Sequence, residues 1–468
     1  MSSEKNNNKG TFNSNFGFLM SSIGSAVGLG NLWGFPYKMG MGGGFAFLLI
    51  YVLLVATVGY PLMVGEIALG RKTGKAAIQA FKRVDKRFTF TGYFDTVAPF
   101  LLICFYVVFG GYIIKYFLIN LGDFLNLGFG LQGMDSGAFF EQFMSSGLEP
   151  LIYTYIFLFA TFLIVVRGIS GGIERFSNFA MPALFVMLLV VVFRANTLPG
   201  AREGLAFIFK PNFEVFKGMG WLSVLGNAGS QMFFSLSLSS GAVIAYGSYL
   251  SKSADIESNG WIIPVADSVV AVLAAMAVMP AVFAFGLEPG GGPGLLFVSL
   301  QTVFQSMGAT GPIFGMVFYL LVLFAALTSS IAMTEGAVSA MLDGQQERGK
   351  EPNRLKMTLI FTIGAFLGGT LVSLDALGSS GMPHPFGLST WLDVFDLGAE
   401  GILMPLGGLF FSILLGWFKP GILDDEVALT GPFRSRGFYQ FSLRWIAPVF
   451  LFFIVIIQLN AFFGFFPM

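Results

Sequence analysis

The chain has 468 residues, of which 55% are hydrophobic and only 11% are charged, and its 26 basic residues balance its 26 acidic ones. This composition excludes an ordinary soluble protein, and the zero net charge gives no sign of a nucleic-acid partner. The single cysteine, Cys104, excludes an internal disulfide, and the single histidine, His384, is expected on the surface of a loop. The sequence therefore predicts an all-α membrane protein embedded in the lipid bilayer.

Several segments are apolar enough to cross a bilayer, which takes about 20 residues in a helix. The eleven candidates are residues 15–38, 43–70, 93–121, 149–166, 176–194, 219–248, 260–286, 311–341, 355–374, 389–417 and 438–466. Because no hydrophilic stretch between them is long enough for a separate domain, we expect a single transmembrane domain over residues 1–468. The polar start of the chain lacks the basic region of a signal peptide.

The positive charges of the loops predict the orientation of the chain. The loop after the second segment holds seven Lys and Arg residues between positions 71 and 87, whereas residues 116–166 hold none. We therefore expect this loop and the N-terminus in the cytoplasm, and an odd number of crossings then puts the C-terminus outside. The outer loop at 195–218 is an exception, because it carries three basic residues.

The first segment is poor in large apolar residues at its centre, where residues 24–31 read GSAVGLGN. Glycine destabilises a helix interior by about 1 kcal/mol relative to alanine. In the bilayer, an amide or carbonyl freed from a helix needs another partner. Interrupted helices of this kind line cavities and coordinate ions. The sequence therefore predicts a broken first helix.

The sixth segment is also small and polar at its centre, reading QMFFSLSLSSG over residues 231–241. An offset of five segments is expected if residues 15–194 and 219–417 are inverted repeats, with 438–466 as an additional helix. The site then lies where the two interruptions meet. The alternative is that these small residues serve close helix packing.

Two acidic residues lie within apolar segments, where a carboxylate costs about 2.5 to 3.5 kcal/mol on insertion scales. Glu66 is expected to accept hydrogen bonds from amides freed by a broken helix, and the alternative is an interfacial acid near Arg71. Asp267 lies deeper and needs a cation or a proton. Both therefore mark an ion or substrate path.

The eighth segment places Ala325, Thr328, Ser329 and Met333 on one helical face. Hydroxyl groups in a membrane helix often bond to a carbonyl of the preceding turn. The functional alternative is that they coordinate a small cation together with carbonyls of the opened first helix.

At these positions the chain resembles the neurotransmitter:sodium symporter family, in particular its bacterial amino-acid transporters. The matching motifs are residues 24–31 followed by Phe-Pro-Tyr at 35–37, Pro-Leu-Met at 61–63 with Glu66, residues 233–237 and residues 327–330. The match runs through the first ten segments, and the family's usual twelfth is missing. The resemblance implies eleven transmembrane helices in a bacterial-type cytoplasmic membrane: a 5+5 inverted repeat with discontinuous helices 1 and 6, plus one additional helix.

The resemblance also implies two sodium sites. One uses the carbonyls of Ala26 and Ser235, the side chains of Asn31, Ser235 and Asp267, and the substrate carboxylate. The other uses the carbonyls of Gly24, Val27 and Ala325 and the hydroxyls of Thr328 and Ser329. Chloride-dependent relatives have neutral side chains near the position of Asp267. Its charge is expected to replace the anion, so no chloride requirement is expected.

The substrate class follows from Gly28, because monoamine carriers of the family have an aspartate there. A glycine leaves the amides of the first helix free for a carboxylate, so we expect an amino acid, and first an apolar one. Tyr106 is expected to bond its carboxylate, and Phe234 to close over it from outside. Ser240 replaces a large apolar residue and makes the pocket roomier. The family's pocket positions are Ser25, Ala26, Leu29, Gly30, Leu102, Tyr106, Phe234, Ser235, Ser237, Ser240, Ser329 and Met333.

The gates of the family are altered in this chain. The outer-gate arginine directly before Phe-Pro is Gly34 here, while its acidic partner remains as Asp396. Lys38 lies on the same helical face as Gly34 and is expected to pair with Asp396, unless it extends to the membrane interface. The inner gate maps onto Lys9 and Asp343, with Tyr249 nearby.

Together these features predict a sodium-coupled symporter that imports an amino acid by alternating access. The sequence shows neither a catalytic nucleophile with an adjacent general base nor a phosphate-binding loop, so we expect no enzymatic activity. Three alternatives remain: a proton-coupled transporter with Asp267 as the titrating group, an ion channel, and a substrate-sensing receptor. The residues leave the oligomeric state open.

Overall fold

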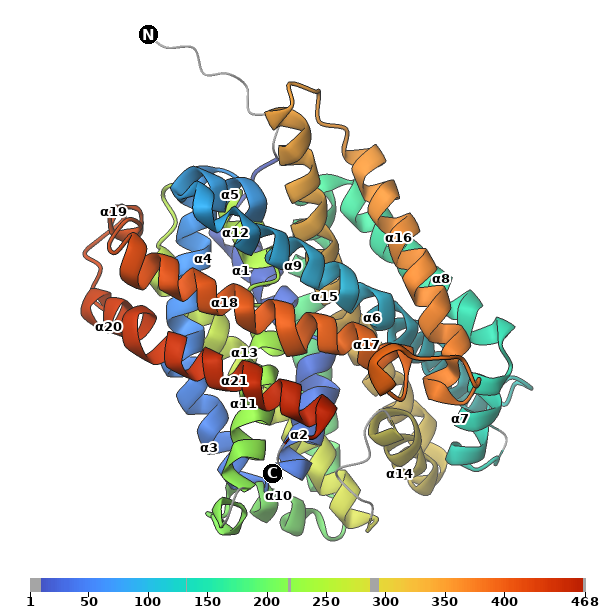
Figure 1. Cartoon of the computed structure of the whole chain (residues 1–468). Coiled ribbons are helices and arrows are strands. Elements are labelled where there is room, and N and C mark those ends of the chain that lie inside the picture. The colour runs from blue at the N-terminus through green and yellow to red at the C-terminus, as the bar shows by residue number, and fades with distance from the viewer. Residues whose placement is uncertain (1–9, 132, 218–219, 287–293, 466–468) are drawn as a thin grey trace.

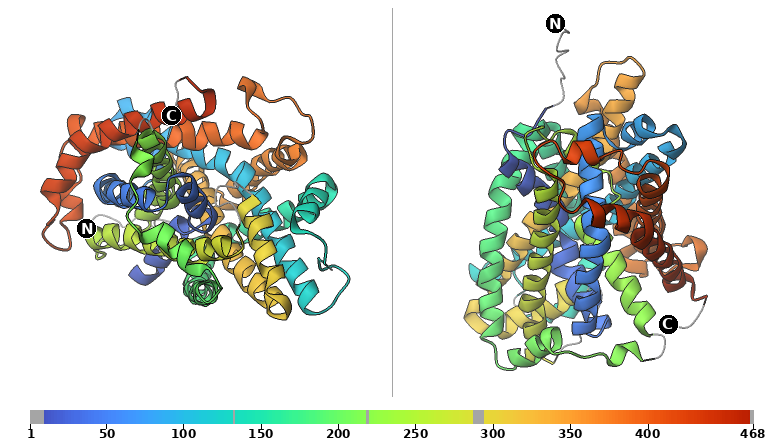
Figure 2. Two further views of the ribbon diagram at one scale, coloured as in Figure 1. Left: turned by 90° about the horizontal axis from the view of Figure 1, so that it is seen from below. Right: turned by 90° about the vertical axis from the view of Figure 1, so that its left-hand side faces the viewer.

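The computed structural model describes residues 10–131, 133–217, 220–286 and 294–465. This part of the chain is helical and contains no strand, so the expected all-α membrane architecture is confirmed. Nine helices in it are long and apolar enough to cross a membrane. They cover Phe45–Thr73, Lys86–Phe124, Leu148–Val166, Ile169–Asn196, Ile256–Ala284, Gly308–Glu347, Arg354–Gly378, Trp391–Phe418 and Arg436–Phe463. The side view in Figure 2 shows long helices extending from one end of the molecule to the other.

Two further spans are interrupted, as the sequence predicts. The first consists of α1 (Asn15–Ala26), a π-helical stretch (Gly30–Gly34) and α2 (Phe35–Met41). The sixth consists of α11 (Gly220–Leu236) and α12 (Ala242–Ser248). Each predicted apolar segment overlaps one of these interrupted spans or one of the long helices.

The interrupted spans lie among helices from both halves of the chain. α1 packs against α9 (Glu174–Asn196), α13 (Ile256–Ala284) and α15 (Gly311–Glu347). α12 packs against α4 (Tyr60–Thr73) and α15, and α15 packs along α6 (Thr89–Phe124). Figure 1 shows α21 (Ala447–Phe463) beside α18 (Met404–Ile413) on the outside of this bundle.

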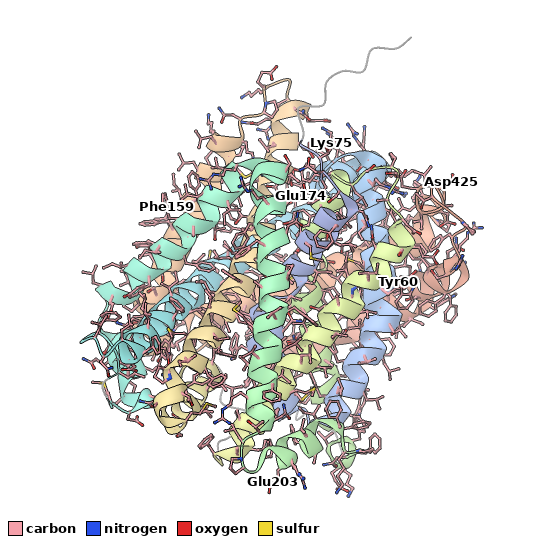
Figure 3. All side chains as sticks on the ribbon, turned by 180° about the vertical axis from the view of Figure 1, so that it is seen from behind. Tyr60, Lys75, Phe159, Glu174, Glu203 and Asp425 are labelled. Atoms are coloured by element: carbon pink, nitrogen blue, oxygen red, sulfur yellow. The ribbon has the colours of Figure 1, made fainter. Side chains whose placement is uncertain are left out.

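The loops predicted for opposite sides of the membrane lie at opposite ends of the structure. In Figure 3, Lys75 and Asp425 lie at one end and Glu203 lies at the other. Lys75 belongs to the basic loop between the second and third spans, and Glu203 belongs to the loop between the fifth and sixth. The basic loop and the exceptional loop at 195–218 are therefore on different sides.

Short helices missed by the hydropathy pattern cover the ends of the bundle. They are α5 (Ala77–Val84), α7 (Ser136–Ser145), α10 (Ala201–Phe209), α14 (Leu300–Ser306) and α19 (Asp424–Val427). α5, for example, buries Ala77, Ala80 and Phe81 while its Lys and Arg residues stay in solvent. Such a helix is too short and too polar to resemble a membrane span.

The expectation for His384 is wrong. Its side chain is 11% exposed, and its Nε2 atom lies 2.8 Å from Oδ1 of Asp375, which is buried at the end of α16 (Arg354–Asp375). The other carboxylate oxygen, Oδ2, accepts the amide of Trp391 at 2.9 Å. His384 therefore ties its loop to the helix ends instead of pointing into solvent.

Candidate functional site

The interruption of the first span exposes backbone groups that side chains then satisfy. Val27 has an extended conformation with φ −75° and ψ 98°, which ends α1. The freed amide of Gly28 donates to Oδ1 of Asn31 at 3.0 Å, and the amide of Leu29 donates to the hydroxyl of Tyr106 at 3.2 Å. The carbonyl of Gly30 accepts the side-chain amide of Gln231 at 2.7 Å. Both donors and acceptors thus line this break.

The interruption of the sixth span has a left-handed backbone. Ser237, Ser239 and Gly241 have φ values of 51°, 52° and 69°. Residues other than glycine rarely adopt this backbone conformation, so surrounding contacts must hold Ser237 and Ser239 in place. The two breaks meet directly, because the hydroxyl of Ser237 donates to the carbonyl of Ser25 at 2.8 Å.

Glu66 of α4 supports the second break. Its Oε1 atom accepts the amide of Ser239 at 2.8 Å, as expected for an acid that caps freed backbone groups. The alternative of an interfacial acid beside Arg71 is wrong, because Glu66 is 1% exposed and Arg71 pairs with Glu426 at 2.8 Å.

Asp267 lies fully buried beside both breaks. Its Oδ1 atom accepts the side-chain amide of Asn31 at 2.7 Å, and both of its carboxylate oxygens lie 2.9 Å from the hydroxyl of Ser235. Tyr51, which the sequence reasoning missed, donates its hydroxyl to Oδ2 at 2.9 Å. Within the described residues no basic side chain forms an ion pair with Asp267. This cluster of carboxylate, hydroxyl and amide oxygens offers ligands typical of a small hard cation.

A second group of oxygens lies between α1 and α15. The hydroxyl of Ser329 lies 3.2 Å from the carbonyl of Ser25, 3.4 Å from that of Gly24 and 3.5 Å from that of Val27. Thr328 donates its hydroxyl to the carbonyl of Ala325 within its own helix, at 3.0 Å. A Cβ on Gly24 would lie 3.0 Å from Cβ of Thr328. The structure therefore brings together the five residues assigned to the second sodium site.

A small cavity lies where the two breaks meet. It is lined by Ser25, Ala26, Gly28, Gly30, Leu102, Tyr106, Phe234, Ser237, Ser240, Ser329, Met333 and Met404. Ten of these are among the twelve predicted pocket residues. Leu29 and Ser235 do not line it, and Ser235 instead turns its hydroxyl to Asp267. Gly28, from which the substrate class was predicted but which was not counted among the pocket positions, also lines the cavity. Met404 was missed, because nothing in the tenth span marks it apart from other apolar residues.

Gly28 and Gly30 permit close approach to this cavity. A Cβ on Gly28 would lie 2.3 Å from Oγ of Ser329 and 2.8 Å from the hydroxyl of Tyr106. A Cβ on Gly30 would lie 2.9 Å from the ring of Phe234. Any side chain at either position would therefore displace a pocket residue.

A second cavity lies beyond Phe234 and contains the predicted outer-gate residues. It is lined by Trp33, Gly34, Tyr37, Lys38, Phe105, Phe234, Leu377, Thr390, Leu392, Asp393, Asp396 and Glu400. The prediction that Lys38 pairs with Asp396 is wrong, because Lys38 pairs with Glu400. The Nζ atom of Lys38 lies 3.6 Å from Oε2 of Glu400 and donates to Oγ of Ser230 at 2.9 Å. Glu400 follows Asp396 by about one helical turn and therefore presents its carboxylate to the same cavity.

The inner-gate residues Asp343 and Tyr249 have further partners among the described residues. Asp343 is buried and accepts Nζ of Lys75 at 3.1 Å and the amide of Ala76 at 2.7 Å. Lys9, its predicted partner, lies outside the described residues. Tyr249 donates its hydroxyl to Glu335 at 2.8 Å, and Glu335 pairs with Arg354. Lys75, Glu335 and Arg354 were missed because many charges occur in the loops and helix ends on this side of the bundle.

Comparisons with known proteins agree with this geometry. The model of the sodium:neurotransmitter symporter family matches residues 9–129 and 146–464. An uncharacterized sodium-dependent transporter of Bacillus subtilis, YhdH, is 37% identical over 96% of each chain. One of Haemophilus influenzae is 32% identical over 90% of this chain and 91% of its own. The crystal structure of MhsT in complex with L-phenylalanine is 33% identical, covers 96% of this chain and 100% of its own, and superimposes with a TM-score of 0.85.

Proposed function

The chain belongs to the sodium:neurotransmitter symporter family and is a multi-pass membrane protein, and from this premise we propose that it imports an amino acid together with sodium by alternating access. The observation that carries the proposal is the buried carboxylate of Asp267 between the two broken helices. A carboxylate at this depth needs a cation or a proton, and the oxygens around it favour sodium. One sodium ion moving down a potential of 100 mV supplies about 2.3 kcal/mol for uptake.

The two sodium sites are proposed at the clusters described above. Asn31, Ser235 and Asp267, with the carbonyl of Ala26, would hold one ion beside the substrate. Thr328 and Ser329, with the carbonyls of Gly24, Val27 and Ala325, would hold the other. The hydroxyl of Ser329 supports this assignment, because it lies 3.4 Å from the carbonyl of Gly24 and 3.5 Å from that of Val27.

The substrate is proposed to be an apolar amino acid. Its carboxylate would meet the freed amides of the first span and the hydroxyl of Tyr106, which now accepts the amide of Leu29. Its side chain would lie against Leu102, Met333 and Met404. The phenylalanine bound by MhsT is consistent with such a pocket.

Transport is proposed to be independent of chloride. Asp267 supplies a fixed negative charge within hydrogen-bonding distance of Asn31 and Ser235. A second anion beside it would be repelled in a site of low dielectric constant. Uptake should therefore continue when gluconate replaces chloride.

The gates are proposed to close on either side of this site. Lys38 and Glu400 would close the outer cavity above Phe234, and Lys75 with Asp343 would close the inner side. With the N-terminus in the cytoplasm, the first and sixth spans would rock against the remaining helices within a single transmembrane domain.

Uptake of labelled amino acids into proteoliposomes tests the proposal. We expect saturable uptake of one or more apolar amino acids that requires an inward sodium gradient and generates a current. A current without substrate would indicate a channel, and binding without uptake would indicate a receptor. Uptake driven by a proton gradient alone would indicate a proton-coupled transporter. Any of these results would contradict sodium symport.

A further inference from the structure

Two buried carboxylates beside the second break take no part in the proposed sodium sites. Glu66 of α4 is 1% exposed and Asp95 of α6 is 2% exposed. They interact electrostatically, and no basic side chain of the described residues neutralises either of them. Burial of two adjacent negative charges is strongly unfavourable, so something else must reduce the charge.

Several oxygen atoms around these carboxylates lack a hydrogen-bond partner among the described residues. They include Oε2 of Glu66, Oδ1 of Asp95 and the hydroxyl of Ser239, and each lies on a side chain that is at least nine-tenths buried. An unsatisfied buried oxygen costs about 1 to 3 kcal/mol. Ser239 links the two acids, because its amide donates to Glu66 and its side chain lies near Asp95. The two unpartnered carboxylate oxygens indicate that a hydrogen donor is missing from the hydrogen-bond pattern.

The unpartnered oxygens of Asp95 and Ser239 face one small space beside Gly407 of α18. A Cβ on Gly407 would lie 2.7 Å from Oδ1 of Asp95 and 3.5 Å from Oγ of Ser239. Cβ of Ser239 lies 3.1 Å from the same position. These contacts leave less room than a methyl group needs, and a proton on one of the carboxylates needs no additional space.

We propose that Glu66 and Asp95 hold one proton between them, on one carboxylate or the other, and form a proton-binding site beside the interruption of the sixth span. The proton is taken up from water and returned to water, and no other bond is made or broken. A shared proton lowers the charge of the pair to minus one and turns one of its oxygens into a donor.

The site is connected to the substrate cavity through the backbone. Oε1 of Glu66 accepts the amide of Ser239, and the neighbouring Ser237 and Ser240 line the cavity. The occupancy of the proton site therefore acts on the left-handed stretch that separates α11 from α12.

Charged groups on the surrounding elements have partners elsewhere. These pairs are Lys82 with Glu347, Arg83 with the carbonyl of Thr73, Lys75 with Asp343, and Glu335 with Arg354. α18 carries no titratable residue. Tyr439 of α20 (Arg436–Phe441) lies behind Gly65, with its hydroxyl 3.2 Å from the position of a Cβ there. The two carboxylates therefore determine the charge of the site.

Infrared difference spectroscopy of the purified protein in detergent tests the proposal without relying on transport. In choline buffer near neutral pH, an Asp267→Asn background, which removes the other buried acid that needs a cation or a proton, should show the C=O stretch of a buried protonated carboxylic acid. Asp95→Asn and Glu66→Gln, each added to this background, should reduce this band by the same amount, because the remaining carboxylate no longer faces a second one. The matched control Asp135→Asn changes an aspartate at the start of α7 and should keep it.

Several results would overturn the proposal. They are the absence of the band in the Asp267→Asn background, its reduction by only one of the two added substitutions, and its disappearance from that background when sodium replaces choline, which would assign the pocket to sodium. Gly407→Ala provides an independent variant, since its methyl group would disfavour an ionised Asp95 and keep the band to higher pH.

A second measurement asks whether the site affects transport. Uptake by the wild type should decrease as the pH rises and the shared proton is lost, whereas Asp95→Asn should have a flatter pH profile. An unchanged profile would contradict the coupling to the second break. Failure of uptake at every pH would instead contradict the proposed symport and leave the infrared result standing.

Discussion

The side-chain amide of Asn31 donates to the carboxylate of Asp267 at 2.7 Å across 236 positions of the chain. The same Asn31 accepts the freed amide of Gly28 through its side-chain oxygen. One residue thus joins the break in the first span to the acid of the seventh. A change at Asp267 should therefore alter both ion binding and the geometry of the break.

Asp267→Asn should raise the sodium concentration for half-maximal uptake by about tenfold or more, equivalent to at least about 1.4 kcal/mol. The amide keeps the size of the side chain but removes the charge that attracts the cation. The variant should also gain a dependence on chloride. Sodium titrations of uptake in chloride and in gluconate measure both effects, and an unchanged sodium requirement would remove Asp267 from the ion site.

Tyr51→Phe should have a smaller effect of the same kind. It removes one hydrogen bond to a charged group, worth about 1.5 to 3 kcal/mol at most, and leaves the carboxylate in place. We expect weaker sodium binding without any chloride dependence. If Tyr51→Phe required chloride as strongly as Asp267→Asn does, the hydroxyl of Tyr51 and the charge of Asp267 would have the same role in ion binding, contrary to this prediction.

Gly28→Ala should abolish substrate uptake while the protein still folds in the membrane. The new Cβ would lie 2.3 Å from Oγ of Ser329, so the pocket or the break must shift. Gly344→Ala is a suitable control, because a Cβ there has no neighbour within 4 Å. Binding of labelled substrate to purified protein separates a lost pocket from lost expression, and wild-type binding by Gly28→Ala would contradict the assignment.

Lys38→Ala should weaken closure of the outer cavity. Without the lysine, Glu400 loses its cation, and the cavity should stay open to water in the presence of sodium and substrate. A cysteine introduced by Thr390→Cys should therefore react faster with an impermeant maleimide, since the native Cys104 is buried. Lys217→Ala, at an exposed pair with Glu214, is the control. Equal labelling rates would exclude a gating role for Lys38.

Met404→Ala should shift the preference toward larger apolar amino acids. The substitution removes a long side chain from the cavity wall. In an apolar pocket, one methylene group changes the preference between two substrates by about 10- to 200-fold. Competition between labelled phenylalanine and unlabelled amino acids of increasing size measures the shift. An unchanged order of inhibition would show that Met404 does not contact the substrate side chain.

Much of the architecture could be predicted because the bilayer imposes strong rules on sequence. Glycines at 24–31 and serines at 235–240 are conspicuous in apolar spans, and a lone carboxylate such as Asp267 is equally so. Tyr51 is not conspicuous in the sequence, because aromatic residues are common in the spans. Only the fold shows that its hydroxyl reaches the carboxylate of Asp267. The partner of Lys38 was misjudged for a similar reason: Asp396 and Glu400 lie one turn apart, and the choice depends on helix rotation.

The short helices illustrate another limit of pattern reading. α5 lies within the basic loop at 71–87 and buries four of its residues, and α14 lies between two predicted spans, in a stretch expected to be a loop. Neither is long or apolar enough to stand out. Their positions depend on the ends of distant spans that they cover, which hydropathy along the chain does not record.

Phe234 contributes to the walls of both the inner pocket and the outer cavity. The two spaces are therefore separated at this point by a partition one side chain thick. Opening the proposed path between them requires this ring to move, and side-chain rotations are far faster than movements of whole helices. In the proposed transport cycle, the step at Phe234 is therefore expected to be faster than the rocking of the bundle.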